Sequence, residues 1–279
     1  MPATPLNFED VDGLLVHPDY RDVLARNGIC SLDALMSTEG EQRLDKPGLA
    51  AWRERIELML QTAQGPRRFF LKRFIRPPLG QQFGRALRGY SSTAQVEWSW
   101  LMRLRQVDIR VPEPVACGAC KLGPLERCSV LLTAELPGES LEKWLPTHVS
   151  DLSRSVRVHL MEVLANLVGR LHGAGLVHRD LYLSHIFVHW QSSDRCTLSL
   201  LDLQRVMAPG LRRRRWLVKD LAALNYSTPP AAASRADRLR WLRLYLGNNK
   251  PAGDERSLIR AIECKTQRIA RHSAKRGLG

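Results

Sequence analysis

The sequence predicts an α+β fold with two lobes, a small β-rich N-lobe and a larger, mostly helical C-lobe. Three observations predict it. β-prone runs joined by turn residues fill much of the first half, a strongly amphipathic helix opens the second half, and the chain then stays largely helical. The segment Leu136-Pro137-Gly138 interrupts the pattern between them. We therefore expect an N-lobe over residues 1–135 and a C-lobe over residues 136–279.

The expected N-lobe contains a hairpin. Residues 53–60 and 67–75 are β-prone and are separated by a Gln-Gly-Pro turn. Strand alternation places Phe70, Lys72 and Phe74 on one face of the second strand. A lysine on an apolar strand face is unfavourable unless it meets an anion.

Three further segments complete the expected N-lobe. Residues 94–104 have apolar residues at helical spacing and carry Glu97, so we expect one helix there. Residues 109–116 hold two prolines and should be extended, and residues 130–133 read as a buried strand. The first 50 residues show no strong periodicity and stay unassigned.

The expected C-lobe begins with a helix over residues 156–171, whose leucines and valines form one buried stripe. Gly173 and Gly175 end it. The segment 176–188 contains a short strand, which lies with the apolar run at 197–203 on either side of the polar turn Gln191–Asp194, and this pattern predicts a second hairpin. After Gly210 the sequence is basic and helical.

Two acidic residues flank this second hairpin. Asp180 precedes it and Asp202 ends it, so the two carboxylates can meet at one end. Neighbouring carboxylates are unfavourable unless they hold a cation or share a proton, and a divalent metal with oxygen ligands is one solution. Together with Lys72 and Glu97 they match the needs of phosphoryl transfer: a cation for nucleotide phosphates, a carboxylate for magnesium and a carboxylate that receives a hydroxyl proton.

The order of Lys72, Glu97, His178-Arg179-Asp180 and Asp202 resembles that of the protein-kinase fold. The chain more specifically resembles the lipopolysaccharide core kinases, a bacterial family that phosphorylates heptose or Kdo sugars of the inner core. The matching segments are RRFFLKRF, VEWSWLMRLRQVDI, LHGAGLVHRDLYLSHIFV, LSLLDLQRV and RRRRWLVKDLAALNYST, which run in the family's order from about residue 50 to 228.

The resemblance implies a role for each matched residue. Lys72 would contact the α- and β-phosphates of ATP, and Glu97 would pair with Lys72. Asp180 would be the catalytic base toward a sugar hydroxyl, and Asp202 would hold Mg²⁺. His185 stands where protein kinases have asparagine, and it would either ligate the metal or instead hydrogen-bond Asp180 or a phosphate. His178 and Asp220 are implied to brace the catalytic loop.

The sequence also departs from the protein-kinase pattern. No clear G-x-G-x-x-G precedes the lysine strand, and the segment from Gly40 to Gly48 is only a weak candidate for the turn that covers the phosphates. Leu203-Gln204 replaces Phe-Gly after the metal aspartate, and no Ala-Pro-Glu follows. These departures argue against a regulated protein kinase.

Charge points to an anionic partner. The net charge is +14, and residues 211–279 hold 17 basic and 5 acidic residues, which leaves the first 210 residues near neutral. In the tail, Leu258, Ile259, Ile262 and Ile269 form an apolar edge flanked by basic residues from Arg256 to Arg276. Such a helix is typical of an anionic membrane surface, although a helix packed on the C-lobe fits the pattern too. Nucleic acid is disfavoured, because no stacking aromatics are interleaved with the basic run.

Together, the residues and the resemblance predict an enzyme that uses ATP and Mg²⁺ to phosphorylate a heptose or Kdo hydroxyl of the lipopolysaccharide core. With no secretory pattern and six cysteines that form no disulfide framework, we expect a cytoplasmic protein, peripheral on the cytoplasmic face of the inner membrane. One alternative is a non-catalytic kinase-like protein that binds anionic lipid or nucleic acid. Another is a kinase with a protein or small-molecule acceptor.

Overall fold

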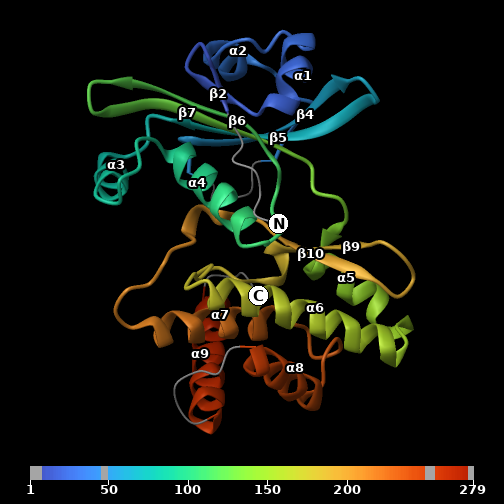
Figure 1. Ribbon diagram of the computed structural model, residues 1–279. Helices are drawn as coiled ribbons and strands as arrows, with labels where there is room; N and C mark the ends of the chain where they lie inside the picture. The colour runs from blue at the N-terminus through green and yellow to red at the C-terminus, as the bar shows by residue number, and fades with distance from the viewer. Residues whose placement is uncertain (1–7, 45–49, 249–254, 276–279) are drawn as a thin grey trace. The chain divides into compact units, whose positions relative to one another are not determined.

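The computed structural model describes residues 8–44, 50–248 and 255–275 (Figure 1). The chain divides into two compact units. Unit 1 comprises Met1–Gln106 and Pro112–Leu136, and unit 2 comprises Val107–Val111 and Pro137–Gly279. The predicted α+β class is confirmed, because unit 1 is built on a seven-stranded sheet and unit 2 on helices with a three-stranded sheet.

The sheet of unit 1 is antiparallel throughout, in the order β1-β2-β6-β7-β5-β4-β3. Its strands are β1 (Glu9–Val11), β2 (Leu14–Val16), β3 (Gln42–Arg43), β4 (Arg53–Thr62), β5 (Gly65–Ile75), β6 (Pro114–Leu122) and β7 (Leu125–Ala134). The first expected hairpin is β4–β5, where Thr62 pairs with Gly65. Gly65 has a φ of +108°, which only glycine adopts readily.

Helices cover both faces of this sheet. They are α1 (Arg21–Arg26), α2 (Leu32–Ser37), α3 (Leu79–Ala86) and α4 (Thr93–Gln106), and a 3₁₀ turn, η1 (Pro18–Tyr20), precedes α1. Figure 1 shows α1 and α2 on one face and α4 on the other. The sequence predicted only α4, since the other helices have six to eight residues and are too short for a clear period.

The alternation of β5 divides its side chains between the two faces. Phe69 and Leu71 are fully buried and share a core with Leu24 of α1 and Leu35 of α2. Lys72 and Glu97 meet on the opposite face, which α4 covers. The strand therefore presents its lysine to a helix instead of to solvent.

Unit 2 is mostly helical. Its α-helices are α5 (Leu141–His148), α6 (Arg154–Gly173), α7 (Arg213–Ser227), α8 (Arg235–Asn248) and α9 (Glu255–Lys275), with 3₁₀ turns η2 (Val149–Asp151), η3 (Leu183–His185) and η4 (Leu203–Arg205). Its sheet has the order β10-β9-β8, formed by β8 (Glu139–Ser140), β9 (Ile186–Trp190) and β10 (Cys196–Leu200).

The two strongest C-lobe predictions are confirmed. The helix expected over 156–171 is α6, whose first turn is capped by the Ser153 hydroxyl accepting from the Val156 N–H at 3.3 Å. The second hairpin is β9–β10, with Ile186 opposite Leu200. The N–H of Leu200 also donates to the Arg110 carbonyl at 2.9 Å, which ties residues 107–111 to this unit.

The basic tail forms α9, and its apolar edge packs against α7. Leu258 and Ile262 are buried, and Asn225 of α7 donates to the Thr266 hydroxyl at 3.1 Å. The apolar edge of α9 is therefore packed on the C-lobe, as one of the two expectations had it. Most of the basic side chains of α9 point to solvent. Arg276 lies outside the described residues. Across the described part of the chain, no helix combines the length and apolar character that crossing a bilayer requires.

Candidate active site

In unit 1, the strand lysine is held by a helix glutamate. Lys72 Nζ of β5 donates to Glu97 Oε1 at 2.6 Å and to Oε2 at 2.8 Å. Both side chains are largely removed from solvent. Cys117 of β6 is fully buried near this pair, and burial together with the Glu97 charge raises the pKa of its thiol to about 12. The thiol is therefore neutral, and the negative charge beside Lys72 comes from Glu97.

The Gly40–Gly48 segment, the candidate for the phosphate-covering turn, is described only in part. Residues 45–49 lie outside the described residues. Gly40 lies tightly against β4, where a Cβ would come within 2.6 Å of the Glu57 carbonyl oxygen and closer still to Ile56. That close approach is a packing reason for this glycine.

In unit 2, the catalytic-loop motif His178-Arg179-Asp180 is braced from α7. The buried Asp220 carboxylate accepts the backbone N–H groups of His178 and Arg179, each at 2.7 Å. Its Oδ2 also lies 3.3 Å from His172 Nε2 of α6. Arg179 has a φ of +72°, in the left-handed region, and these hydrogen bonds hold it there. The bracing geometry implied for Asp220 is present.

Two cations surround the Asp180 carboxylate. Arg205 of η4 contacts both carboxylate oxygens, at 2.9 Å and 2.8 Å, and Lys219 Nζ of α7 lies 3.7 Å from Oδ1. Burial lowers the pKa of Lys219, while the charge of Asp180 raises it. Neither cation was predicted from the sequence. Arg205 follows Asp202 by three residues, and Lys219 immediately precedes Asp220. This closeness in sequence to two predicted residues was the only feature that could have indicated them.

His185 and Asp202 meet at one end of the β9–β10 hairpin. His185 Nε2 lies 3.8 Å from Asp202 Oδ2, and its Nδ1 lies 2.8 Å from the Asp180 carbonyl oxygen. Asp202 has a φ of +54°, which turns the chain sharply after β10. His185 thus contacts both the metal candidate and the backbone of the candidate base.

His178 lies behind this cluster and is fully buried. Its Nε2 lies 2.9 Å from the Leu201 carbonyl oxygen, next to Asp202. Burial lowers the pKa of its imidazole, which favours a neutral ring that donates to this carbonyl. His178 therefore supports the segment that carries Asp202.

No group of three or more His, Cys, Asp or Glu residues with metal-site geometry occurs among the described residues. The donor set nevertheless fits Mg²⁺, because this ion is commonly bound by one or two carboxylates while substrate phosphates and water complete its octahedron. Asp202 offers such a carboxylate. The His185 nitrogen is a poorer ligand for a hard cation, so its contacts fit a positioning role better.

The structure thus brings the five predicted residues together in two groups. Lys72 and Glu97 form an ion pair in unit 1, and Asp180, His185 and Asp202 cluster in unit 2. That both groups face one nucleotide stays a prediction. Fold and site together define a phosphotransferase with a kinase-like fold.

The comparisons with known proteins identify the family. The model of the lipopolysaccharide kinase (Kdo/WaaP) family matches residues 81–245. The lipopolysaccharide core heptose(I) kinase WaaP of Pseudomonas aeruginosa is 32% identical over 183 residues, which cover 63% of this chain and 68% of that protein. The WaaP of Escherichia coli K12 is 30% identical over 192 residues, covering 66% and 72%. This chain belongs to the lipopolysaccharide kinase (Kdo/WaaP) family.

A solved structure agrees with this assignment. The structure titled "WaaP in complex with acyl carrier protein" superposes with a TM-score of 0.68 at 26% identity, covering 92% of this chain and 98% of that one. The kinase-like fold is therefore confirmed, and the chain is a lipopolysaccharide core kinase that phosphorylates a sugar hydroxyl. The alternative of a non-catalytic kinase-like protein is not supported.

Proposed function

We propose that this protein transfers the γ-phosphoryl group of ATP to a heptose hydroxyl of the lipopolysaccharide inner core. The observation that carries the proposal is the aspartate loop braced by Asp220, which presents Asp180 beside Arg205 and Lys219. The heptose(I) kinases among its relatives favour heptose as the acceptor, and Kdo is the second candidate.

Each site residue has a role that its contacts support. Asp180 accepts the proton of the attacking hydroxyl, and Arg205 and Lys219 orient its carboxylate. Lys72, fixed by Glu97, binds phosphate oxygens. Asp202 holds Mg²⁺, which neutralises phosphate charge when bound. His185 positions the Asp180 backbone through the 2.8 Å contact with its carbonyl oxygen.

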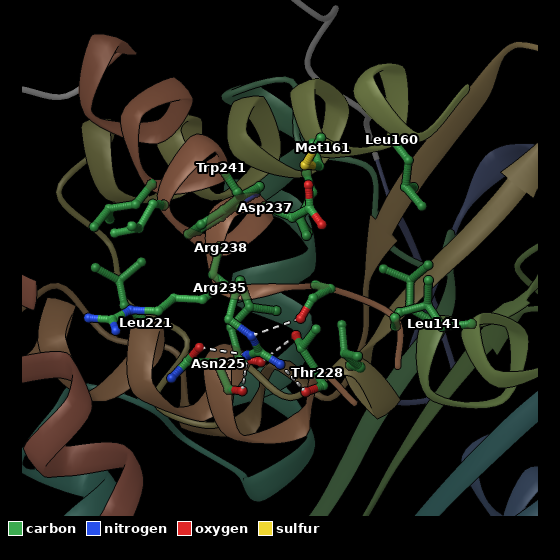
Figure 2. Close-up of a pocket in the computed structure, with 18 of the residues that line it drawn as sticks. Leu141, Leu160, Met161, Leu221, Asn225, Thr228, Arg235, Asp237, Arg238 and Trp241 are labelled. Carbon is green, nitrogen blue, oxygen red and sulfur yellow. Dashed lines mark hydrogen bonds between the residues drawn. The ribbon is translucent and has the colours of Figure 1, made fainter. Parts of the chain in front are cut away.

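Unit 2 also contains an apolar cavity that suits an acyl chain (Figure 2). The cavity measures about 240 Å³, and leucine is the commonest residue of its lining, with Leu141, Leu160 and Leu221 among them. Arg238 is one of the lining residues, and it donates to the carbonyls of Asn225 and Thr228 at 2.8 Å and 2.7 Å. Because a related structure contains acyl carrier protein, we propose that this chain binds an acylated carrier protein whose hydrocarbon enters the cavity.

We propose a cytoplasmic enzyme that works at the cytoplasmic face of the inner membrane, where its glycolipid acceptor would lie. The exposed basic residues of α9 support attraction to anionic headgroups, worth about 1 kcal/mol for each residue near the surface. The apolar edge of α9 does not contribute, because it is packed against α7.

The experiment that tests the acceptor is mass spectrometry of the core oligosaccharide from cells with and without the intact gene. The proposal expects one phosphate fewer on an inner-core heptose in the deletion strain. A phosphate missing from Kdo instead would show that Kdo is the acceptor sugar. An unchanged core would contradict the proposal.

A further inference from the structure

Helix α3 buries its polar side chains and exposes its apolar ones. Its polar residues Gln82 and Arg85 are only 7% and 4% exposed. Its apolar residues Leu79 and Phe83 are each 67% exposed, and Leu87, which ends the helix, is 74% exposed. A spacing of four residues places these three apolar side chains on one face. Soluble helices normally present the opposite arrangement.

A buried polar network fixes α3 in this orientation. Gln82 Nε2 donates to the Pro77 carbonyl at 2.7 Å, and Gln82 Oε1 accepts the Glu126 N–H at 2.8 Å. Arg85 forms an ion pair with the buried Glu126 carboxylate, which also accepts the Thr93 N–H at 2.9 Å. Burying this ion pair carries a desolvation penalty that burying leucines would not. The buried contacts of Gln82 and Arg85 therefore hold the apolar face of α3 toward solvent.

The surroundings of α3 are open and include further apolar side chains. A Cβ placed on Gly80 or Gly84 would meet no atom within 4 Å. Leu122 and Leu125 are exposed at the β6–β7 hairpin, immediately before the Glu126 that anchors the helix. Figure 1 shows α3 beside α4 at the margin of unit 1. The three side chains therefore project from a ridge and do not line a groove.

The chain segment that carries the ridge is basic. No acidic residue occurs between Glu57 and Glu97, whereas seven basic residues do. Of these, Arg76 and Arg88 flank α3 and are exposed. Exposed leucine and phenylalanine bordered by arginine is the pattern of a helix lying in the headgroup region of an anionic bilayer.

We propose that α3 is a membrane-insertion element, with Leu79, Phe83 and Leu87 entering the boundary of an anionic bilayer. The inference rests on the proposed function in one respect, that the acceptor is a glycolipid. A docked protein fits less well, because a stable protein interface buries about 800 Å² on each partner and a ridge of three side chains offers little of that. The element supplies the apolar contribution that α9 cannot make.

The test compares the full-length protein with the triple variant L79Q/F83S/L87Q. Partitioning is measured by co-sedimentation with vesicles of phosphatidylethanolamine and phosphatidylglycerol, without ATP. The matched control is L211Q, since Leu211 is 93% exposed and lies beside the basic residues Arg212–Arg215. Thermal unfolding should be unchanged in both variants, because the replaced side chains are exposed.

We expect the triple variant to partition at least ~10-fold more weakly while L211Q behaves as the wild type. The triple variant should phosphorylate a water-soluble, deacylated core acceptor normally and a vesicle-embedded acceptor poorly. Wild-type partitioning by the triple variant would overturn the inference, as would no partitioning by the wild type. So would loss of binding to acyl carrier protein with vesicle binding intact. Partitioning needs no catalysis, so failure of the kinase assays alone would contradict only the proposed function.

Discussion

At the scale of single residues, the site depends on charges that neutralise one another out of water. Lys72 and Glu97 are the clearest pair, since both oxygens of Glu97 accept from one ammonium group. The sequence predicted these two residues from strand alternation and from one glutamate on the next helix. It could not predict Arg205, because only the folded turn after Asp202 brings that guanidinium to Asp180.

A double-mutant cycle at Lys72 and Glu97 separates their roles. We expect Lys72→Met to lower kcat about 10²–10³-fold by removing a positive charge from the phosphates. It should also lower the free energy of unfolding by about 3 kcal/mol, because the buried Glu97 carboxylate loses the positive charge of Lys72. Adding Glu97→Gln should restore much of that stability and none of the activity. Additive losses in both measurements would contradict the pairing.

Tyr20 gives a prediction for alkaline pH. Burial and the neighbouring Glu113, whose carboxylate accepts from the Tyr20 hydroxyl at 2.5 Å, raise the pKa of this phenol from 10.0 to about 12. Above pH 10 the unfolded chain releases this proton more readily than the folded chain, so the free energy of unfolding falls as the pH rises toward 12. Tyr20→Phe should flatten this fall in chemical denaturation at successive pH values. An identical slope in both proteins would show that Tyr20 is not the group responsible.

At the scale of elements, α7 organises the catalytic loop. It contributes Asp220, which holds two backbone N–H groups of the loop, and Ser227, whose hydroxyl accepts the Leu183 N–H at 3.0 Å. It also contributes Lys219, which donates to the Arg179 carbonyl at 2.5 Å. The loop geometry is therefore set mainly by a helix that follows it by about 40 residues.

Asp220→Asn tests this brace. We expect the free energy of unfolding to fall by about 1.5–3 kcal/mol, because hydrogen bonds to a buried charge are replaced by weaker ones and an amide N–H meets a backbone N–H. kcat should fall as well, since the loop that carries Asp180 loosens. The matched control is Asp194→Asn in the turn between β9 and β10, whose exposed side chain accepts from the nearby Ser192 hydroxyl at 2.8 Å. Equal effects of the two variants would contradict a special role for Asp220.

The elements themselves were predictable where they were long. The β4–β5 and β9–β10 hairpins and α6 follow from periodicity and turn residues. Helices α1 and α2 did not, because six residues make fewer than two turns. The orientation of α3 was beyond any hydrophobic pattern, since its anchor is Glu126, more than 40 residues away in sequence.

At the scale of the whole molecule, the proposed reaction requires both units to bind one nucleotide. Lys72 lies in unit 1 and Asp202 in unit 2. Adding ATP and Mg²⁺ should therefore slow backbone hydrogen exchange in β5 and in the turn after β10 within the same titration. Asp202→Asn should weaken the protection in both segments. Protection confined to one unit at saturating nucleotide would contradict a shared site.

The most direct measurement is transfer of a labelled γ-phosphate from ATP to purified core glycolipid that lacks its heptose phosphates. We expect incorporation into heptose by the wild-type protein and a roughly 10²–10⁴-fold slower rate for Asp180→Asn, with an unchanged thermal unfolding midpoint. Equal rates for the two proteins, or no incorporation by the wild type, would contradict the proposed reaction.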